Sequence, residues 1–202
     1  MRLHVVLLAL LGMTLSGITH AEDGGLVFNP GSNRWERKSG VSVTPKMMRS
    51  DKSPVAREIV QFESRYKPGS IVIRTSERRL YYVLTDGTAL RYGIGVGRDG
   101  FAWKGRERIS RKAEWPSWTP PEEMRRREAE IGRILPATME GGPDNPLGAR
   151  ALYLGSTLYR IHGTNQPWTI GGAVSSGCIR MANEDVIDLY GKAVVGALVF
   201  VE

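Results

Sequence analysis

One cysteine and one histidine in the C-terminal third of the chain have the residue types of a nucleophile and its base. Cys178 is the only cysteine in 202 residues, and His162 precedes it by sixteen positions. The other two histidines, His4 and His20, lie in an N-terminal apolar leader. A thiolate attacks carbonyl carbon, and a nearby imidazole can take the thiol proton. One Cys and one His cannot supply the four ligands of structural zinc, so we expect no metal site.

Small residues surround the cysteine. Ser175, Ser176 and Gly177 come directly before it, and Gly163 follows the histidine. Such residues leave room for a substrate backbone and allow peptide N–H groups to turn toward a developing oxyanion. A free cysteine also packs readily in a core, and a single histidine is often structural. The residues alone therefore favour a Cys–His enzyme but leave the packing alternative open.

Residues 162–165 (HGTN) and 175–181 (SSGCIRM) resemble the signature of the YkuD-type L,D-transpeptidases. The similarity continues outside this region and covers residues 68–202. The further similar segments are 96–98 (VGR), 111–116 (RKAEWP), 118–121 (WTPP) and 145–150 (NPLGAR). Some members of the family carry a second histidine where this chain has Ser176. The base implied by the resemblance is therefore His162.

The resemblance implies an acyl transfer on peptidoglycan. Cys178 would attack the carbonyl between the L-centre of a diamino acid and the terminal D-Ala of a tetrapeptide stem, releasing D-Ala and leaving a thioester. An amine would then accept the acyl group, and no cofactor is needed. The backbone carbonyl of Gly163 would orient His162, and the thiolate–imidazolium pair would keep the nucleophile ionised. The backbone N–H groups of Cys178 and Gly177 would stabilise the oxyanion.

Four further residues are candidates for substrate binding. Arg180 follows Cys178 by two positions, which on a strand places both on one face, where the guanidinium could pair with a stem carboxylate. A structural salt bridge from Arg180 to Asp185 is the alternative. Ser176 and Asn165 are expected beside the pocket. Trp118 is expected to line the substrate groove or to pack in the core.

Three readings of function remain open. The acceptor amine could belong to a second stem, which would give a 3-3 cross-link, or to an outer-membrane protein or lipoprotein that is being anchored. Water could instead resolve the thioester, which would make the protein an L,D-carboxypeptidase or an amidase. The third hypothesis is a wall-binding protein without catalytic activity, and the formal net charge of +7 is consistent with it.

The N-terminus has the order of a secretory signal peptide. Arg2 and His4 precede an apolar run at residues 5–15, and the small residue Ala21 lies at a suitable cleavage position. The run is shorter than the roughly 20 residues of a membrane span, although an uncleaved anchor is the alternative. We expect export to the periplasm after cleavage, with no further membrane span. Nucleic acid suits the basic charge but not that compartment.

The remaining pattern predicts a flexible extension at residues 22–67, with a short helix around 55–66, and then a single catalytic domain at residues 68–202. This domain is expected to be mostly β, with sandwich-like mixed sheets and few short helices. Residues 103–148 carry few strand signals. Helices are expected at 121–131 and 184–190, the second capped by Asn183. Strands are expected at residues 71–73, 80–84, 89–96, 151–154, 158–162 and 197–201.

Overall fold

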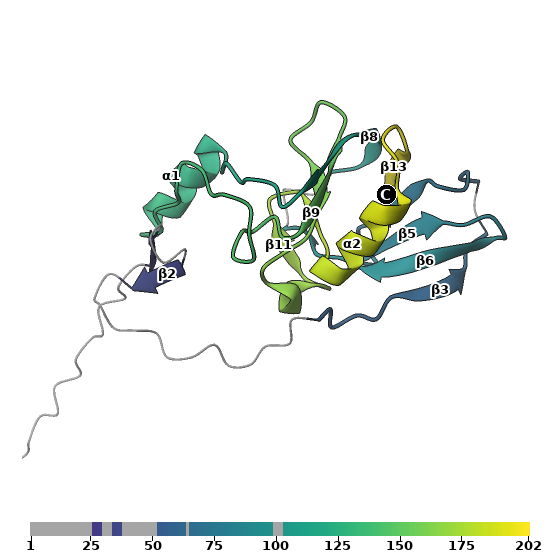
Figure 1. Ribbon diagram of the computed structural model, residues 1–202, viewed down its shortest axis with the longest axis horizontal. Helices are drawn as coiled ribbons and strands as arrows, with labels where there is room; N and C mark the ends of the chain where they lie inside the picture. The colour runs from purple at the N-terminus through teal and green to yellow at the C-terminus, as the bar shows by residue number, and fades with distance from the viewer. Residues whose placement is uncertain (1–25, 30–33, 38–51, 64, 99–102) are drawn as a thin grey trace, which may run out of the picture.

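The computed structural model describes residues 26–29, 34–37, 52–63, 65–98 and 103–202, and its main feature is a nine-stranded mixed sheet (Figure 1). The strand order is β12-β10-β9-β8-β13-β4-β5-β6-β3. The bounds are β3 Glu58–Gln61, β4 Ile71–Arg74, β5 Arg79–Val83, β6 Thr88–Gly93, β8 Gly105–Glu114, β9 Arg150–Leu154, β10 Arg160–His162, β12 Ile179–Arg180 and β13 Leu198–Val201. This confirms the expected mostly-β fold.

The smaller elements complete the fold. They are the pairs β1 Leu26–Asn29 with β2 Arg34–Arg37 and β7 Val96–Gly97 with β11 Ala173–Ser175, the helices α1 Glu122–Glu130 and α2 Asn183–Lys192, and a 3-10 helix at Pro167–Thr169. Both helices lie where the sequence predicted helices. No helix of the described segments is long and apolar enough to cross a membrane. The expected signal peptide lies outside the described residues, as does half of the expected extension.

The hairpin between β5 and β6 shows how the sequence specifies the sheet. Gly87, which follows Asp86 in the turn, has φ +73°, a left-handed conformation that glycine adopts without steric cost. On the two strands, Leu80 pairs with Tyr92, and both side chains are fully buried. Strands β4, β5 and β6 therefore build one end of the core and fix the register of the sheet.

Strand β8 is a long element that the sequence did not predict. Its ten residues carry four basic or acidic side chains before Lys112, and only Ile109 is buried. The strand nevertheless lies near the middle of the sheet, between β9 and β13. A bulge between Ile109 and Arg111 shifts its register. Charged side chains on an open sheet face and the bulge remove the alternating pattern by which strands are recognised.

The predicted helix at residues 55–66 is wrong, because Glu58–Gln61 form the edge strand β3. Val60 pairs with Ala89 of β6, and Ile59 is 66% exposed. The Ser53 hydroxyl donates to the carbonyl of Val55 and accepts from its N–H, which closes a local turn before the strand. The sheet thus begins inside the stretch that was expected to be an extension.

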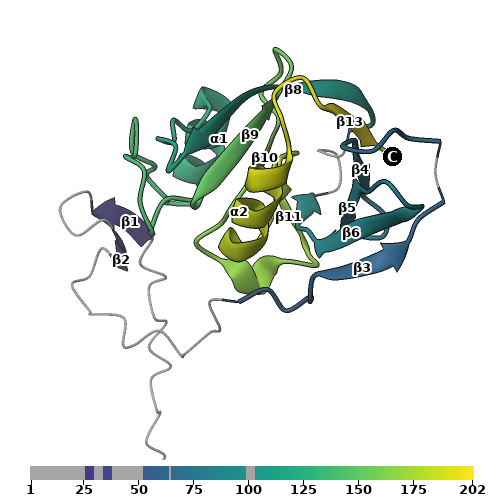
Figure 2. The same ribbon diagram turned by 45° about the vertical axis from the view of Figure 1, so that its right-hand side comes forward.

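Helix α2 covers one face of the sheet across β9 and β10 (Figure 2). Its Val186 and Leu189 are fully buried in one cluster with Leu152 and Ile161. At the helix end, Lys112 Nζ donates to the carbonyls of Tyr190 and Ala193 at 2.6 and 2.7 Å. A cation at this position satisfies carbonyls that no helical N–H can reach.

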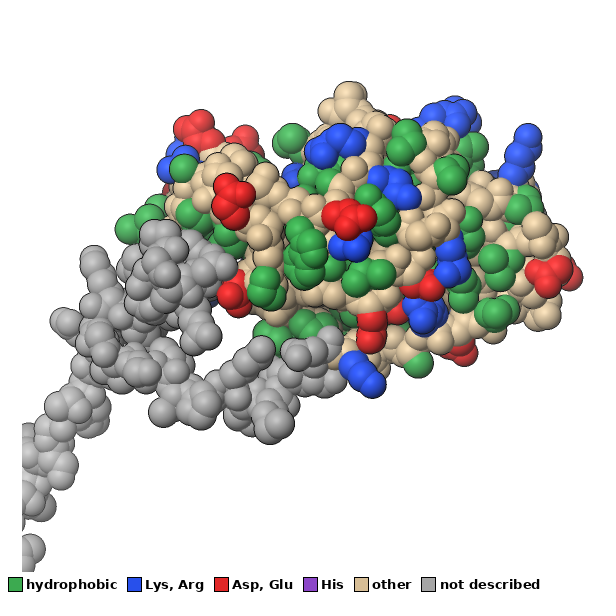
Figure 3. Space-filling model, in the orientation of Figure 1, with side chains coloured by type: hydrophobic (Ala, Val, Ile, Leu, Met, Phe, Trp, Pro, Cys, Tyr) green, Lys and Arg blue, Asp and Glu red, His purple; other side chains and the backbone are tan. Residues whose placement is uncertain are grey.

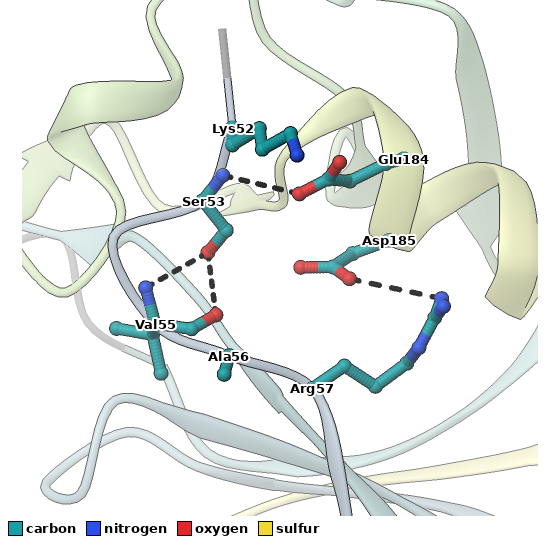
Figure 4. Close-up of a pocket in the computed structure, with 7 residues that line it drawn as sticks. All are labelled: Lys52, Ser53, Val55, Ala56, Arg57, Glu184 and Asp185. Carbon is teal, nitrogen blue, oxygen red and sulfur yellow. Dashed lines mark hydrogen bonds and ion pairs between the residues drawn. The ribbon is translucent and has the colours of Figure 1, made fainter. Parts of the chain in front are cut away.

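The first turn of α2 also holds the chain that precedes β3. Arg57 and Asp185 line a pocket of about 350 Å³, and Figure 4 shows their side chains pointing toward each other. Arg57 lies 3.8 Å from Asp185 and 3.2 Å from Asp188. The second carboxylate oxygen of Asp185 is buried without a hydrogen-bond partner. Burial, partly opposed by Arg57, raises the pKa of Asp185 from 3.8 to about 6.

The face that carries α2 has mixed charge. Figure 3 shows Lys and Arg side chains interspersed with Asp and Glu side chains across it. Two such pairs join Lys192 and Arg57 to Asp188. Exposed pairs of this kind contribute little to stability, and they leave no single-sign field on this face.

The side chain of Asn145 joins several parts of the long segment before β9 by hydrogen bonds. Its side chain is fully buried, and Nδ2 lies within hydrogen-bond distance of the carbonyls of Pro116, Met139 and Glu140. Oδ1 accepts from the N–H of Leu147 at 2.8 Å. One amide thus satisfies backbone groups from three parts of the segment, which only a side chain with both donors and an acceptor can do.

Replacing Asn145 by alanine is therefore expected to lower the free energy of unfolding by about 3 kcal/mol, because several backbone groups lose their buried partner. Urea unfolding followed by circular dichroism measures this change. Asn165→Ala is the matched control, because Asn165 is partly exposed and makes one bond, to the carbonyl of Asp144. Equal losses in the two variants would contradict the role assigned to Asn145.

Candidate active site

Strands β10 and β12 bring the predicted base and nucleophile to one face of the sheet. The strands run parallel, with Ile161 opposite Ile179 and His162 opposite Arg180. Ile161 and Ile179 are buried and face the α2 side. Because side chains alternate along a strand, His162 and Arg180 point to the opposite face. Cys178, two residues before Arg180, shares that face.

His162 is buried, with 4% of its surface exposed, and its tautomer is set by the backbone. Nδ1 lies 2.6 Å from the carbonyl oxygen of Gly163, so Nδ1 carries the proton and donates it. Nε2 is then left with its lone pair, as a general base requires. The backbone partner that the family resemblance implied for His162 is the one found.

The electrostatic surroundings keep the imidazole neutral. Burial, followed by the positive charges of Arg180 and Arg160, lowers the pKa of His162 from 6.5 to about 3. The hydrogen bond to Gly163 opposes this shift. A resting thiolate–imidazolium pair was expected from the sequence, and this environment disfavours its cationic half. At rest, His162 is therefore neutral, and its Nε2 lone pair is free of a proton.

Asn183 fixes the loop that follows the histidine. It was predicted to cap α2, but the capping position is Ala182, and no side chain caps the helix. Asn183 Oδ1 instead accepts from the N–H groups of Ala149 and Thr164, at 2.9 and 3.3 Å. A Cβ at Gly163 would lie 2.3 Å from this oxygen. Glycine at that position is thus required for the close approach that positions His162.

A different set of hydrogen bonds shapes the loop before Cys178. The Ser175 hydroxyl donates to the carbonyl of Cys178 at 2.6 Å and accepts from the N–H of Gly177 at 3.2 Å. Gly177 has φ +105°. The Gly177 N–H was expected to stabilise an oxyanion, but it is directed at Ser175. The N–H of Cys178 is then the remaining candidate donor of the predicted pair.

Trp103, which the sequence did not indicate as a site residue, orients the peptide bond between Gly177 and Cys178. Its indole N–H donates to the carbonyl of Gly177 at 3.1 Å, and its ring stacks on Tyr159 at 4.7 Å between centroids. In a trans peptide the carbonyl and the following N–H point in opposite directions. Holding the Gly177 carbonyl on the Trp103 side therefore turns the N–H of Cys178 away from it.

Arg180 is a cation beside the thiol and not the partner of Asp185. Asp185 is paired with Arg57, so the salt bridge considered for Arg180 does not form. The Nε of Arg180 is buried without a hydrogen-bond partner, and burial lowers the pKa of its guanidinium. The nearby Cys178 raises that pKa and Arg98 lowers it. A buried donor of this kind is placed to bind an anion.

The three weaker candidates have different surroundings. The Ser176 hydroxyl lies 3.4 Å from Arg127 Nη2, which brings α1 to the loop before Cys178. Asn165 donates to the carbonyl of Asp144, outside the catalytic strands. Trp118 forms a backbone bridge with Met139, and its described contacts do not join it to the thiol. Only Ser176 is thus brought beside Cys178.

The thiol itself contacts the chain that leads into β10. Cys178 Sγ lies 3.8 Å from the carbonyl oxygen of Leu158, and the residue is partly exposed. Within the described segments, no group of three or more His, Cys, Asp or Glu side chains could hold a metal ion. The arrangement offers a reachable thiol, a neutral imidazole with a free lone pair, and a neighbouring guanidinium.

Known proteins with similar sequences identify the family of the chain. The model of the YkuD L,D-transpeptidase catalytic domain matches residues 68–201. The Escherichia coli "Probable L,D-transpeptidase ErfK/SrfK" is 36% identical over 193 residues, which cover 93% of this chain and 55% of the relative. The chain thus spans about half the length of the curated relatives it matches.

Two solved structures share the fold. One, from Brucella melitensis and described as a probable carnitine operon oxidoreductase, is 49% identical with a TM-score of 0.50, over 72% of this chain and 92% of that one. The other, an L,D-transpeptidase from Mycobacterium tuberculosis H37Rv, is 16% identical with a TM-score of 0.51, over 66% and 57%. The second likeness concerns the fold alone.

Proposed function

Because the chain belongs to the YkuD family of L,D-transpeptidase catalytic domains, we propose that it is an exported enzyme that transfers the acyl group of a peptidoglycan tetrapeptide stem from D-Ala to an amine. Cys178 is the nucleophile and His162 is the base. The observation that carries the proposal is the hydrogen bond from His162 Nδ1 to Gly163, which leaves Nε2 unprotonated on the face that Cys178 shares.

In the first half of the reaction, Nε2 of His162 takes the thiol proton as sulfur attacks the carbonyl carbon of the diamino acid. The backbone N–H of Cys178 faces the oxyanion, held in that direction by the bond from Trp103 to Gly177. The C–N bond to D-Ala then breaks, and the leaving amine takes the proton from His162. A thioester on Cys178 remains.

In the second half, an acceptor amine attacks the thioester and loses its proton to His162. The C–S bond breaks, and the thiolate regains a proton. The positive charge of Arg180 next to Cys178 suits a carboxylate of the stem. His162 is neutral at rest, so its Nε2 lone pair can accept the proton in each step.

The balance between transpeptidation and hydrolysis depends on the acceptor. Incubation of the full chain with a tetrapeptide stem whose side-chain amine is acetylated, with and without a second stem that has a free amine, tests the proposal by intact-protein and product mass. We expect an acyl adduct on Cys178 and a cross-linked product only when the amine is present. Shortened stems alone in both mixtures would favour an L,D-carboxypeptidase, and the absence of any adduct or product would contradict the proposal.

A further inference from the structure

A row of three side chains runs across the sheet on the same face as Cys178. Arg160 of β10 is opposite Tyr153 of β9, and Tyr153 is opposite Arg111 of β8. Residues opposite one another on adjacent strands point to one face. The neighbouring position on β8, Lys112, points the other way and closes the end of α2. The row therefore lies on the face that α2 does not cover.

The two guanidinium groups of the row flank one aromatic ring. Arg111 Cζ lies 3.7 Å from the centroid of the Tyr153 ring, and Arg160 Cζ lies 5.6 Å from it. A guanidinium stacked on an aromatic face keeps its N–H donors in the plane, where they remain available to a second partner. Arg111 is exposed, and Tyr153 and Arg160 are partly exposed. The row is thus a positively charged surface without an acidic member.

This row begins beside the nucleophile. Arg160 donates to the carbonyl oxygen of Leu158 from Nε at 3.4 Å and from Nη2 at 3.2 Å. The same oxygen lies 3.8 Å from Cys178 Sγ. The charge of Arg160 also acts on His162, whose pKa it lowers. A group attached to sulfur can therefore extend directly over Arg160 toward Tyr153 and Arg111.

We propose that Arg160, Tyr153 and Arg111 form a shelf that binds a carboxylate-bearing segment of the peptide substrate next to the acyl group on Cys178. This inference rests on the proposed function for the identity of the peptide. Two guanidinium groups held by one ring suit a carboxylate, which can accept paired hydrogen bonds. The ring between them suits the aliphatic part of the same segment. The shelf selects substrates by charge, whereas Cys178 and His162 perform the reaction.

Equilibrium binding to a Cys178→Ala protein tests the shelf without bond breaking. The probes are a tetrapeptide stem with free carboxylates and the same peptide with every carboxylate converted to carboxamide. Arg160→Gln and Arg111→Gln, each added to Cys178→Ala, are expected to weaken binding of the carboxylate peptide about tenfold. Binding of the carboxamide peptide is expected to be weaker from the start and to change less than twofold.

Arg106→Gln is the matched control, because Arg106 is exposed on the same strand but lies opposite Phe200 of β13, away from β9. It removes the same charge and is expected to leave both affinities unchanged. Equal losses in Arg106→Gln and Arg160→Gln, or equal losses for the two peptides, would overturn the shelf. If the shelf variants weakened binding of the carboxylate peptide as expected but the wild-type protein released no D-Ala, the result would count against the proposed function alone.

Discussion

Replacing Cys178 by alanine is expected to abolish the release of D-Ala from a tetrapeptide stem, with a loss of at least ~10⁴-fold in kcat/KM. The proposed acyl intermediate is a thioester on this sulfur, and the chain has no other thiol that could substitute. The measurement is D-Ala release followed by mass spectrometry of the intact protein. The wild type should gain the mass of the acylated stem fragment, and the variant should gain none.

The variant should remain folded, because the Cys178 side chain is partly exposed and its described contact is the 3.8 Å approach to Leu158. Its melting temperature is therefore expected to stay within a few degrees of wild type. Arg106→Gln serves as the control for activity, since this exposed side chain lies near β13. A Cys178→Ala protein that processed stems at the wild-type rate would exclude the covalent mechanism.

The fold could be predicted wherever local pattern and burial agree. Strands β4 and β5 are short apolar runs beside turn residues, and both were predicted from the sequence. Strand β8 was not, because one buried residue, Ile109, among charged neighbours gives no alternation. Its place in the sheet is determined by pairing with β9 and β13, which lie far away in sequence. Tertiary pairing here overrides local preference.

The site was predictable in its residue types but not in its supporting contacts. The carbonyl of Gly163 adjoins His162 in sequence, and the family resemblance implied the bond. Trp103 lies 74 positions before Gly177, and no spacing rule connects the two residues. The direction of the Gly177 N–H depends on the φ of +105° at that residue, which sequence does not specify.

Replacing His162 by glutamine is expected to lower kcat/KM for D-Ala release by about 10³-fold or more, because no other base adjoins the thiol in the proposed mechanism. The glutamine amide can still donate a hydrogen bond toward the Gly163 carbonyl, but it cannot accept and return a proton at neutral pH. The rate at which iodoacetamide alkylates Cys178 in this variant should depend on pH differently from the rate in the wild type. An unchanged rate of D-Ala release would remove His162 from the mechanism.

The same substitution has a second expected consequence, for stability in acid. Folding lowers the pKa of His162 from 6.5 to about 3, so between these values the unfolded chain binds a proton that the native chain does not. The free energy of unfolding therefore falls as the pH falls through this range, by up to about 1.4 kcal/mol per pH unit. Above pH 6.5 both states are neutral, and the effect vanishes.

Asp185 acts in the opposite direction over part of this range. Its pKa rises from 3.8 to about 6 on folding, so the native chain binds the extra proton and gains stability as the pH falls from 6 toward 3.8. The two effects offset each other in the wild type. His162→Gln should therefore become more stable than wild type on acidification from pH 6.5 to 4, whereas Asp185→Asn should become less stable. Urea unfolding at pH 4, 5, 6 and 7 distinguishes them, and parallel curves for wild type and His162→Gln would show that the imidazole is not held neutral by burial.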